Sequence, residues 1–118
     1  MIQPLKKGEI RLANLNPGKG TEPSKTRPVL ILQNQSLLDI EHPSTLVIPL
    51  TTNISVNTFP LRIKVNKQDK LVKDSELLID QLRAIDNRRL IGEPLTCLTD
   101  SFLSNVYEAV NQVIGMRE

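Results

Sequence analysis

Short apolar runs separated by polar loop residues recur along the chain and predict β-strands. Residues 28 to 33 are apolar on both faces, which is typical of a central strand. Residues 61 to 65 alternate instead, and Arg62 and Lys64 form their polar face. A strand is also predicted over residues 76 to 85, although that periodicity tolerates a helix. The full set of predicted strands is 8 to 15, 28 to 33, 45 to 50, 61 to 65, 76 to 85 and 91 to 98.

Pro94 places the last of these strands at a sheet edge, or makes it start after the proline. Residues 35 to 40 can form one helical turn. After Thr99 or Asp100, a candidate N-cap, the pattern changes to helical spacing, and Gly115 is expected to close that helix. Its apolar positions are Leu103, Val106, Val110, Val113 and Ile114. Five to seven short strands with one terminal helix predict a mainly β fold, a small closed or nearly closed barrel.

The length of 118 residues predicts a single domain, residues 1 to 118. No apolar run is long enough to cross a bilayer, and the N-terminus lacks the apolar core of a signal peptide. We therefore expect a cytoplasmic protein with no membrane partner. Cys97, the only cysteine, is expected to be a small buried residue rather than a nucleophile.

Positive charge is concentrated in two blocks, residues 1 to 34 and residues 62 to 73. They are interpreted either as two solvated faces or as a groove for a polyanion. Aromatic residues make up only 3% of the chain, which argues against a platform of aromatic side chains that stack bases. A bound nucleic acid would be held by phosphate contacts and hydrogen bonds.

Familiar catalytic patterns are missing from the sequence. His42, the one histidine, is expected in an exposed loop, and one His with one Cys cannot build a common zinc site. No nucleophile elbow, Walker loop or dinucleotide fingerprint occurs, and the carboxylates are scattered. An enzyme built from this chain would have to use Arg, Thr, Asp and backbone groups. Such groups suit a reaction with a strongly anionic transition state.

Four ordered motifs make the chain resemble the MazF/PemK toxins of bacterial type II toxin–antitoxin systems. They are KGEIRLANLNP, GTEPSKTRPVLILQN, VIPLTTN and DSELLIDQLRAIDNRRL. The resemblance implies an SH3-like β-barrel that forms a homodimer. It also implies a sequence-specific endoribonuclease that cleaves single-stranded RNA without a metal or other cofactor. A MazE-like antitoxin would restrain it, and we expect that partner to be acidic and partly disordered.

Carried over by position, Arg27 is the catalytic arginine and Thr51 its partner, while Asp80 and Gln81 match the family's acidic–Gln pair. Arg27 can grip two phosphate oxygens with its planar fork, although an arginine before a strand can also be an ordinary entrance residue. Thr51 donates to the same phosphate or only bonds backbone. Asp80 acts as base, positions the substrate, or pairs with a nearby arginine. The expected RNA contacts are Lys19, Thr21, Glu22, Lys25, Thr52, Asn53, Arg62, Lys64 and Gln81.

The chain departs from the family pattern at Pro23, where a glutamine is usual, at Thr21, where some members carry histidine, and at Leu78, where one branch has arginine. Those departures leave the acid and base less defined than Arg27. A rival hypothesis is a CcdB-like toxin, which shares the barrel but binds DNA gyrase without catalysis. A third is an inactive member of the family in which Pro23 stiffens the loop.

Overall fold

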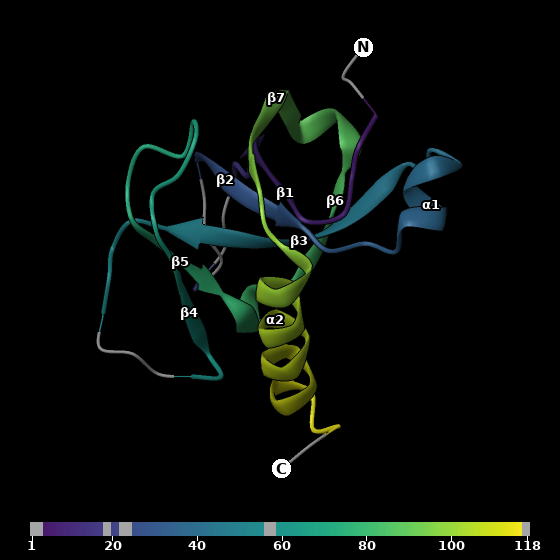
Figure 1. Cartoon of the computed structure of the whole chain (residues 1–118). Helices are drawn as coiled ribbons and strands as arrows, with labels where there is room; N and C mark the ends of the chain where they lie inside the picture. The colour runs from purple at the N-terminus through teal and green to yellow at the C-terminus, as the bar shows by residue number, and fades with distance from the viewer. Residues whose placement is uncertain (1–3, 18–19, 22–24, 56–58, 117–118) are drawn as a thin grey trace.

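The computed structural model describes residues 4–17, 20–21, 25–55 and 59–116 (Figure 1). Within them, seven strands form one antiparallel sheet in the order β4-β5-β3-β2-β1-β7, with β6 also paired to β3. The strands are β1 (Glu9–Asn14), β2 (Thr26–Ile31), β3 (Ser44–Thr51), β4 (Arg62–Val65), β5 (Ser75–Leu78), β6 (Arg83–Asp86) and β7 (Leu90–Cys97). The α-helices are α1 (Gln35–Asp39) and α2 (Asp100–Val113), and the 3-10 turns are η1 (Ile79–Gln81) and η2 (Asn87–Arg89).

Each face of the central strands packs into its own apolar cluster. Leu30 of β2 and Ile48 of β3 join the larger cluster, which α2 covers through Leu103 and Val106. The neighbouring residues along those strands point the other way, and the second cluster consists of Leu5, Ala13, Leu15, Val29, Ile31, Leu38, Val47, Ile85 and Leu90. The curved sheet and the helix below it in Figure 1 confirm the mainly β, barrel-like fold.

The expected single strand over residues 76 to 85 is wrong, because η1 divides it into β5 and β6. Both pieces pair with the same edge of β3: β6 with residues 44 to 47 and β5 with residues 50 and 51. The interruption coincides with Pro49, which has no N–H to donate to a ladder. The chain crosses that position in the 3-10 turn before pairing resumes, and this turn contains Asp80 and Gln81.

The other elements follow the sequence pattern closely. β7 is an edge strand that contains Pro94, and its pairing with β1 shifts register between Ile91 and Thr96. The Thr99 side chain accepts the Phe102 N–H at 3.1 Å and caps α2. Gly115 follows the last helical turn with a φ of 83°. None of the helices in the described ranges is long and apolar enough to cross a membrane.

Two sequence predictions concern single residues off the sheet core. His42 is exposed in the loop between α1 and β3, as expected. Cys97 is exposed rather than buried, and the prediction for it is wrong. Strand alternation explains the error, because Thr96 and Leu98 on either side of it point inward. Partial desolvation, more than the nearby Glu9 carboxylate, raises the pKa of the Cys97 thiol.

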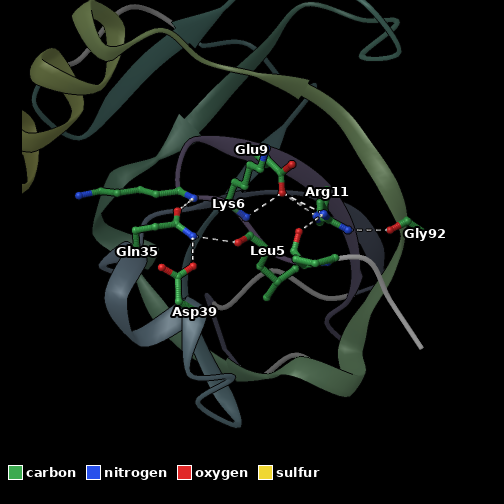
Figure 2. Close-up of polar contacts among 9 residues, drawn as sticks. Leu5, Lys6, Glu9, Arg11, Gln35, Asp39 and Gly92 are labelled. Atoms are coloured by element: carbon green, nitrogen blue, oxygen red, sulfur yellow. Dashed lines mark hydrogen bonds and ion pairs between the residues drawn. The ribbon is translucent and has the colours of Figure 1, made fainter.

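A buried ion pair lies on the sheet face that carries the second cluster. Arg11, whose side chain is 1% exposed, places Nη2 2.9 Å from Oε1 of Glu9, and its Nε donates to the same oxygen at 3.0 Å (Figure 2). Its Nη1 donates to the Gly92 carbonyl at 3.0 Å, and its Nη2 donates to the Pro4 carbonyl at 3.2 Å. One guanidinium therefore joins the N-terminal segment, β1 and β7. The Arg11 guanidinium is buried and makes these hydrogen bonds within the fold, so it adds nothing to the basic surface predicted for residues 1 to 34.

The N-terminal segment is held from its other side by Gln35 of α1. The Gln35 amide accepts the Lys7 N–H at 2.9 Å and donates to the Leu5 carbonyl at 3.2 Å (Figure 2). The Lys7 ammonium lies 4.6 Å from the centre of the Tyr107 ring of α2. These contacts fix the segment between both helices and the sheet.

Removing Arg11 should destabilise the fold more than a typical substitution. Arg11→Met leaves the Glu9 carboxylate buried without its cation, and we expect the free energy of unfolding to fall by about 3–5 kcal/mol. The double variant Glu9→Gln/Arg11→Met should recover part of that loss. Urea denaturation followed by circular dichroism measures both. A loss below about 1 kcal/mol in the single variant would contradict a structural role for the pair.

Candidate active site

Arg27 lies at the start of β2, where the sheet face that forms the second cluster opens to solvent. Val29, two residues further along the same face, is fully buried, whereas Arg27 is half-buried. Its Nη1 donates to the Leu50 carbonyl at 3.3 Å, near the end of β3. Partial burial lowers the pKa of Arg27 from its ordinary value. Strand β2 and the Leu50 carbonyl together place this cation at the rim of the barrel.

Thr51 ends β3 next to Arg27. β2 and β3 pair antiparallel with Val29 opposite Pro49, and the same register continued by two residues places Arg27 beside Thr51. The contact of Arg27 with Leu50, the neighbour of Thr51, agrees with that placement. The Thr51 hydroxyl accepts the Asn53 N–H at 3.1 Å. This bond is the backbone role considered for Thr51 from the sequence, and it leaves the hydroxyl proton able to point toward a ligand.

The row continues across β5 and β4 through Glu76 and Arg62. Thr51 pairs with Glu76, and directly opposite residues of antiparallel strands point to the same face. The Glu76 side chain is 4% exposed, and its Oε1 lies 2.9 Å from Nη1 of Arg62. Arg62 also donates to the Asn53 carbonyl at 3.1 Å. On β4, Lys64 is directly opposite Glu76, and Arg62, two residues before Lys64, lies on the same face. Arg27, Thr51, Glu76 and Arg62 therefore share one face across four strands.

Asp80 and Gln81 belong to a hollow next to this row. The hollow has a volume of about 350 Å³ and is lined by Thr21, Leu61, Arg62, Leu78, Asp80 and Gln81. Arg27 and Thr51 are not among its lining residues. The structure thus brings the predicted residues together in two adjoining groups, Arg27 with Thr51 and Arg62 with Asp80. Arg62, which contacts Glu76 in the row, also lines the hollow.

Asp80 was expected to act on substrate or to pair with Arg27 or Arg83. In the part of the chain that the structure describes, no ion pair links Asp80 to either arginine. Arg83 buries its Nη1 with no hydrogen-bond partner among those residues. The carboxylate of Asp80 is exposed at the hollow, which is the position expected for a group that acts on a ligand.

The remaining predicted RNA contacts are mostly surface residues. Lys25, Thr52, Asn53 and Lys64 are exposed, and Lys64 Nζ lies 4.0 Å from Oδ2 of Asp74. Lys19 and Glu22 lie outside the described residues, as does Pro23. Over the ranges that the structure covers, no three His, Cys, Asp or Glu side chains gather closely enough to hold a metal ion.

The two ends of the loop before Arg27 are hydrogen-bonded to each other. The Lys25 N–H donates to Oδ1 of Asn16 at 2.6 Å, and the Leu15 N–H donates to the Lys25 carbonyl at 3.1 Å. From the 3-10 turn η2, Nη1 of Arg89 donates to the carbonyls of Asn14 at 2.9 Å and Asn16 at 2.7 Å. These bonds fix the chain two residues before Arg27.

Sequence reasoning did not single out Glu76 or Arg89. Glu76 stands in the apolar stretch ELLI, and a carboxylate within a predicted strand was the one available signal that it might be paired. Arg89 had no such signal. Its partners are backbone carbonyls more than seventy residues away, and these cannot be read from side-chain identities.

Comparison with known proteins identifies the family. Residues 6–114 match the model of the PemK-like, MazF-like toxins of type II toxin–antitoxin systems. An Endoribonuclease MazF from Staphylococcus saprophyticus is 34% identical over 113 residues, which is 95% of this chain and 92% of that protein.

Two solved structures share the fold. MazF from Deinococcus radiodurans superposes with a TM-score of 0.77 at 21% identity, over 96% of this chain and 98% of that one. A mycobacterial endoribonuclease in complex with its cognate antitoxin superposes with a TM-score of 0.71 at 18% identity, over 95% and 96%. The family model matches almost the whole chain, and the staphylococcal relative is covered over most of its length; the chain therefore belongs to the PemK-like, MazF-like toxin family of type II toxin–antitoxin systems.

Proposed function

We propose that this toxin is an endoribonuclease that cleaves single-stranded RNA at specific sequences and thereby inhibits translation and growth. The observation that supports it most is the position of Arg27, a half-buried arginine beside the strand-end hydroxyl of Thr51. The name of the staphylococcal relative, Endoribonuclease MazF, supports the same reaction. A gyrase-binding toxin would have no use for a phosphate-gripping arginine at that place.

The reaction uses the 2′-hydroxyl of the RNA as nucleophile. Its oxygen attacks the adjacent phosphorus and loses its proton, the bond from phosphorus to the 5′-oxygen breaks, and that oxygen gains a proton. The phosphorane-like transition state carries extra negative charge on its non-bridging oxygens. Groups that are already oriented toward those oxygens lower the barrier because they need no reorganisation during the reaction.

Arg27 is assigned to the phosphate. Its contact with the Leu50 carbonyl orients the guanidinium at the rim, and its planar set of donors suits two phosphate oxygens. The Arg27 guanidinium acts first by electrostatic stabilisation, because arginine holds its proton too tightly to be an efficient acid or base. Thr51 donates its hydroxyl proton to the same phosphate. Asp80, exposed at the neighbouring hollow, is the candidate base or the residue that positions the attacking nucleotide.

Two protein partners belong to this proposal. Leu46 on the central strand β3 is 41% exposed, as expected if a second copy covers this face in a homodimer. The cognate antitoxin is an acidic, partly disordered chain that orders itself across the basic residues Lys25, Arg27 and Arg62 and blocks access of RNA to them. Sedimentation at micromolar concentration should give a dimer, and hydrogen exchange should show the antitoxin protecting amides near Lys25 and Arg62. A monomer would refute the proposed homodimer. An antitoxin that binds elsewhere and leaves cleavage intact would refute the proposed mode of inhibition.

The reaction itself is tested on a long single-stranded RNA in the presence of EDTA. We expect cleavage at a small set of sequences, with a 2′,3′-cyclic phosphate on one product and a 5′-hydroxyl on the other. An oligonucleotide with 2′-deoxyribose at the cut site should remain intact, since it lacks the nucleophile. Mass spectrometry of the products identifies the ends. Cleavage of the deoxy substrate, or products with a 5′-phosphate, would rule out this mechanism.

Substitutions of Arg27 distinguish the effect of its positive charge on the cleavage rate from the effect of its planar set of hydrogen-bond donors. Arg27→Lys keeps the positive charge but offers a point contact, so we expect it to fail nearly as badly as Arg27→Ala, by about 10²- to 10³-fold in rate. RNA binding should weaken far less, because other basic residues still contact phosphates. Single-turnover rates and equilibrium binding measure the two effects. Arg88→Lys, an exposed arginine paired with Asp86, is the matched control and should keep full activity. A fully active Arg27→Lys variant would remove Arg27 from this role.

A further inference from the structure

Two hollows meet at Arg62. The first is the hollow at Asp80 and Gln81 described above. The second has a volume of about 280 Å³ and is lined by Ile54, Ser55, Phe59, Arg62, Ile63, Lys64 and Glu76. Of the residues that the structure describes, Arg62 alone lines both hollows. Its side chain therefore borders both hollows.

Glu76 holds the Arg62 side chain in place. Its Oε1 accepts from Arg62 Nη1 at 2.9 Å and from the Ser55 N–H at 3.2 Å. Arg62 in turn donates to the Asn53 carbonyl at 3.1 Å. The residue as a whole is 3% exposed, and a carboxylate so deeply buried is costly unless cations and N–H donors satisfy it. One carboxylate thus fixes both the position of Arg62 and the course of the chain over residues 53 to 55.

The second hollow combines an exposed aromatic face with polar groups. Phe59 is 47% exposed and Ile54 is 44% exposed, although both are large apolar side chains. Ser55, Lys64 and Glu76 supply hydrogen-bonding groups around them. A nucleobase has the matching chemistry, since its faces are apolar and its edges carry donors and acceptors. One phenylalanine offers a stacking surface for one base, which is consistent with a chain too poor in aromatic residues for an extended platform.

We propose that the hollow at Ile54 and Phe59 is a second base-binding subsite, and that Glu76 is a positioning residue that sets sequence specificity. In this arrangement two unstacked bases of the RNA occupy the two hollows, and Arg62 stands between them. The inference rests on the proposed RNA cleavage and deepens it. With Arg62 fixed, each hollow keeps its own shape and accepts its own base. If Glu76 releases Arg62, the two hollows merge and discrimination at both positions falls.

The test compares cleavage of an RNA pool randomised around the preferred site, with product ends sequenced to give relative rates for each base at each position. Glu76→Gln keeps the shape and one acceptor but removes the charge that holds Arg62. We expect discrimination to fall by about tenfold at two positions, because hydrogen bonds to charged groups are the stronger ones. The rate at the best site should fall far less than the roughly 10²- to 10³-fold expected for Arg27→Ala, since Arg27 and Thr51 are unchanged.

Phe59→Ala identifies the subsite independently. It should reduce discrimination on the order of tenfold at one position only, and that position should be one of the two altered by Glu76→Gln. Glu93→Gln is the matched control, because Glu93 contacts Lys70 in an exposed pair away from both hollows. It should reproduce the wild-type profile.

Several outcomes would overturn the inference while leaving the proposed function intact. One is wild-type RNA cleavage with unchanged base preferences in both variants. A uniform slowing at all sites in Glu76→Gln would reveal a purely structural carboxylate. Phe59→Ala that weakens binding of an acidic antitoxin peptide but not base discrimination would assign the hollow to a protein partner. A wild-type protein that cuts no RNA would instead refute the proposed function itself.

Discussion

The buried pair of Arg11 and Glu9 is the constraint on which the rest of the structure depends. Arg11 is opposite Val29 in the pairing of β1 with β2, and Ala13 is opposite Arg27, so both arginines lie on the same sheet face. Arg11 donates to the carbonyls of Pro4 and Gly92 and so links the N-terminal segment to β7. Arg27, at the open end of that face, remains half-exposed. The same residue type therefore joins the N-terminal segment to β7 at one end of the face and presents a cation at its other end.

Strand positions could be predicted from the sequence because each strand buries apolar residues in one of the two clusters. Val29 and Ile31 pack into one cluster while Leu30 packs into the other, which explains the continuous apolar run of β2. The turn at Ile79–Gln81 could not be predicted in the same way. The interruption is associated with Pro49 on β3, a strand that pairs with both β5 and β6, and only the tertiary pairing reveals it.

The candidate site shows a similar division. Arg27, Thr51, Asp80 and Gln81 were predicted from motifs, and the structure places them at one end of the barrel in two adjoining groups. Glu76 and Arg89 were not predicted, because each acts by fixing a partner that is distant in sequence. Glu76 contacts Arg62 fourteen residues before it and Ser55 twenty-one residues before it. Motifs identify residues that face a ligand more readily than residues that hold those residues in place.

The closed root of the loop before Arg27 has a consequence for how such proteins diversify. Arg89 binds the carbonyls of Asn14 and Asn16, and the Asn16 side chain accepts the Lys25 N–H. These bonds join the two ends of the loop where it meets β1 and β2. A loop whose two ends are tied this close together can change in length or composition at little entropic cost to the remainder of the fold. Segments transplanted from other family members could then be accepted between residues 17 and 24 without displacing the arginine that follows. Under the proposed function, exchange of this loop alters the RNA contacts that the loop itself makes, while Arg27 keeps its position.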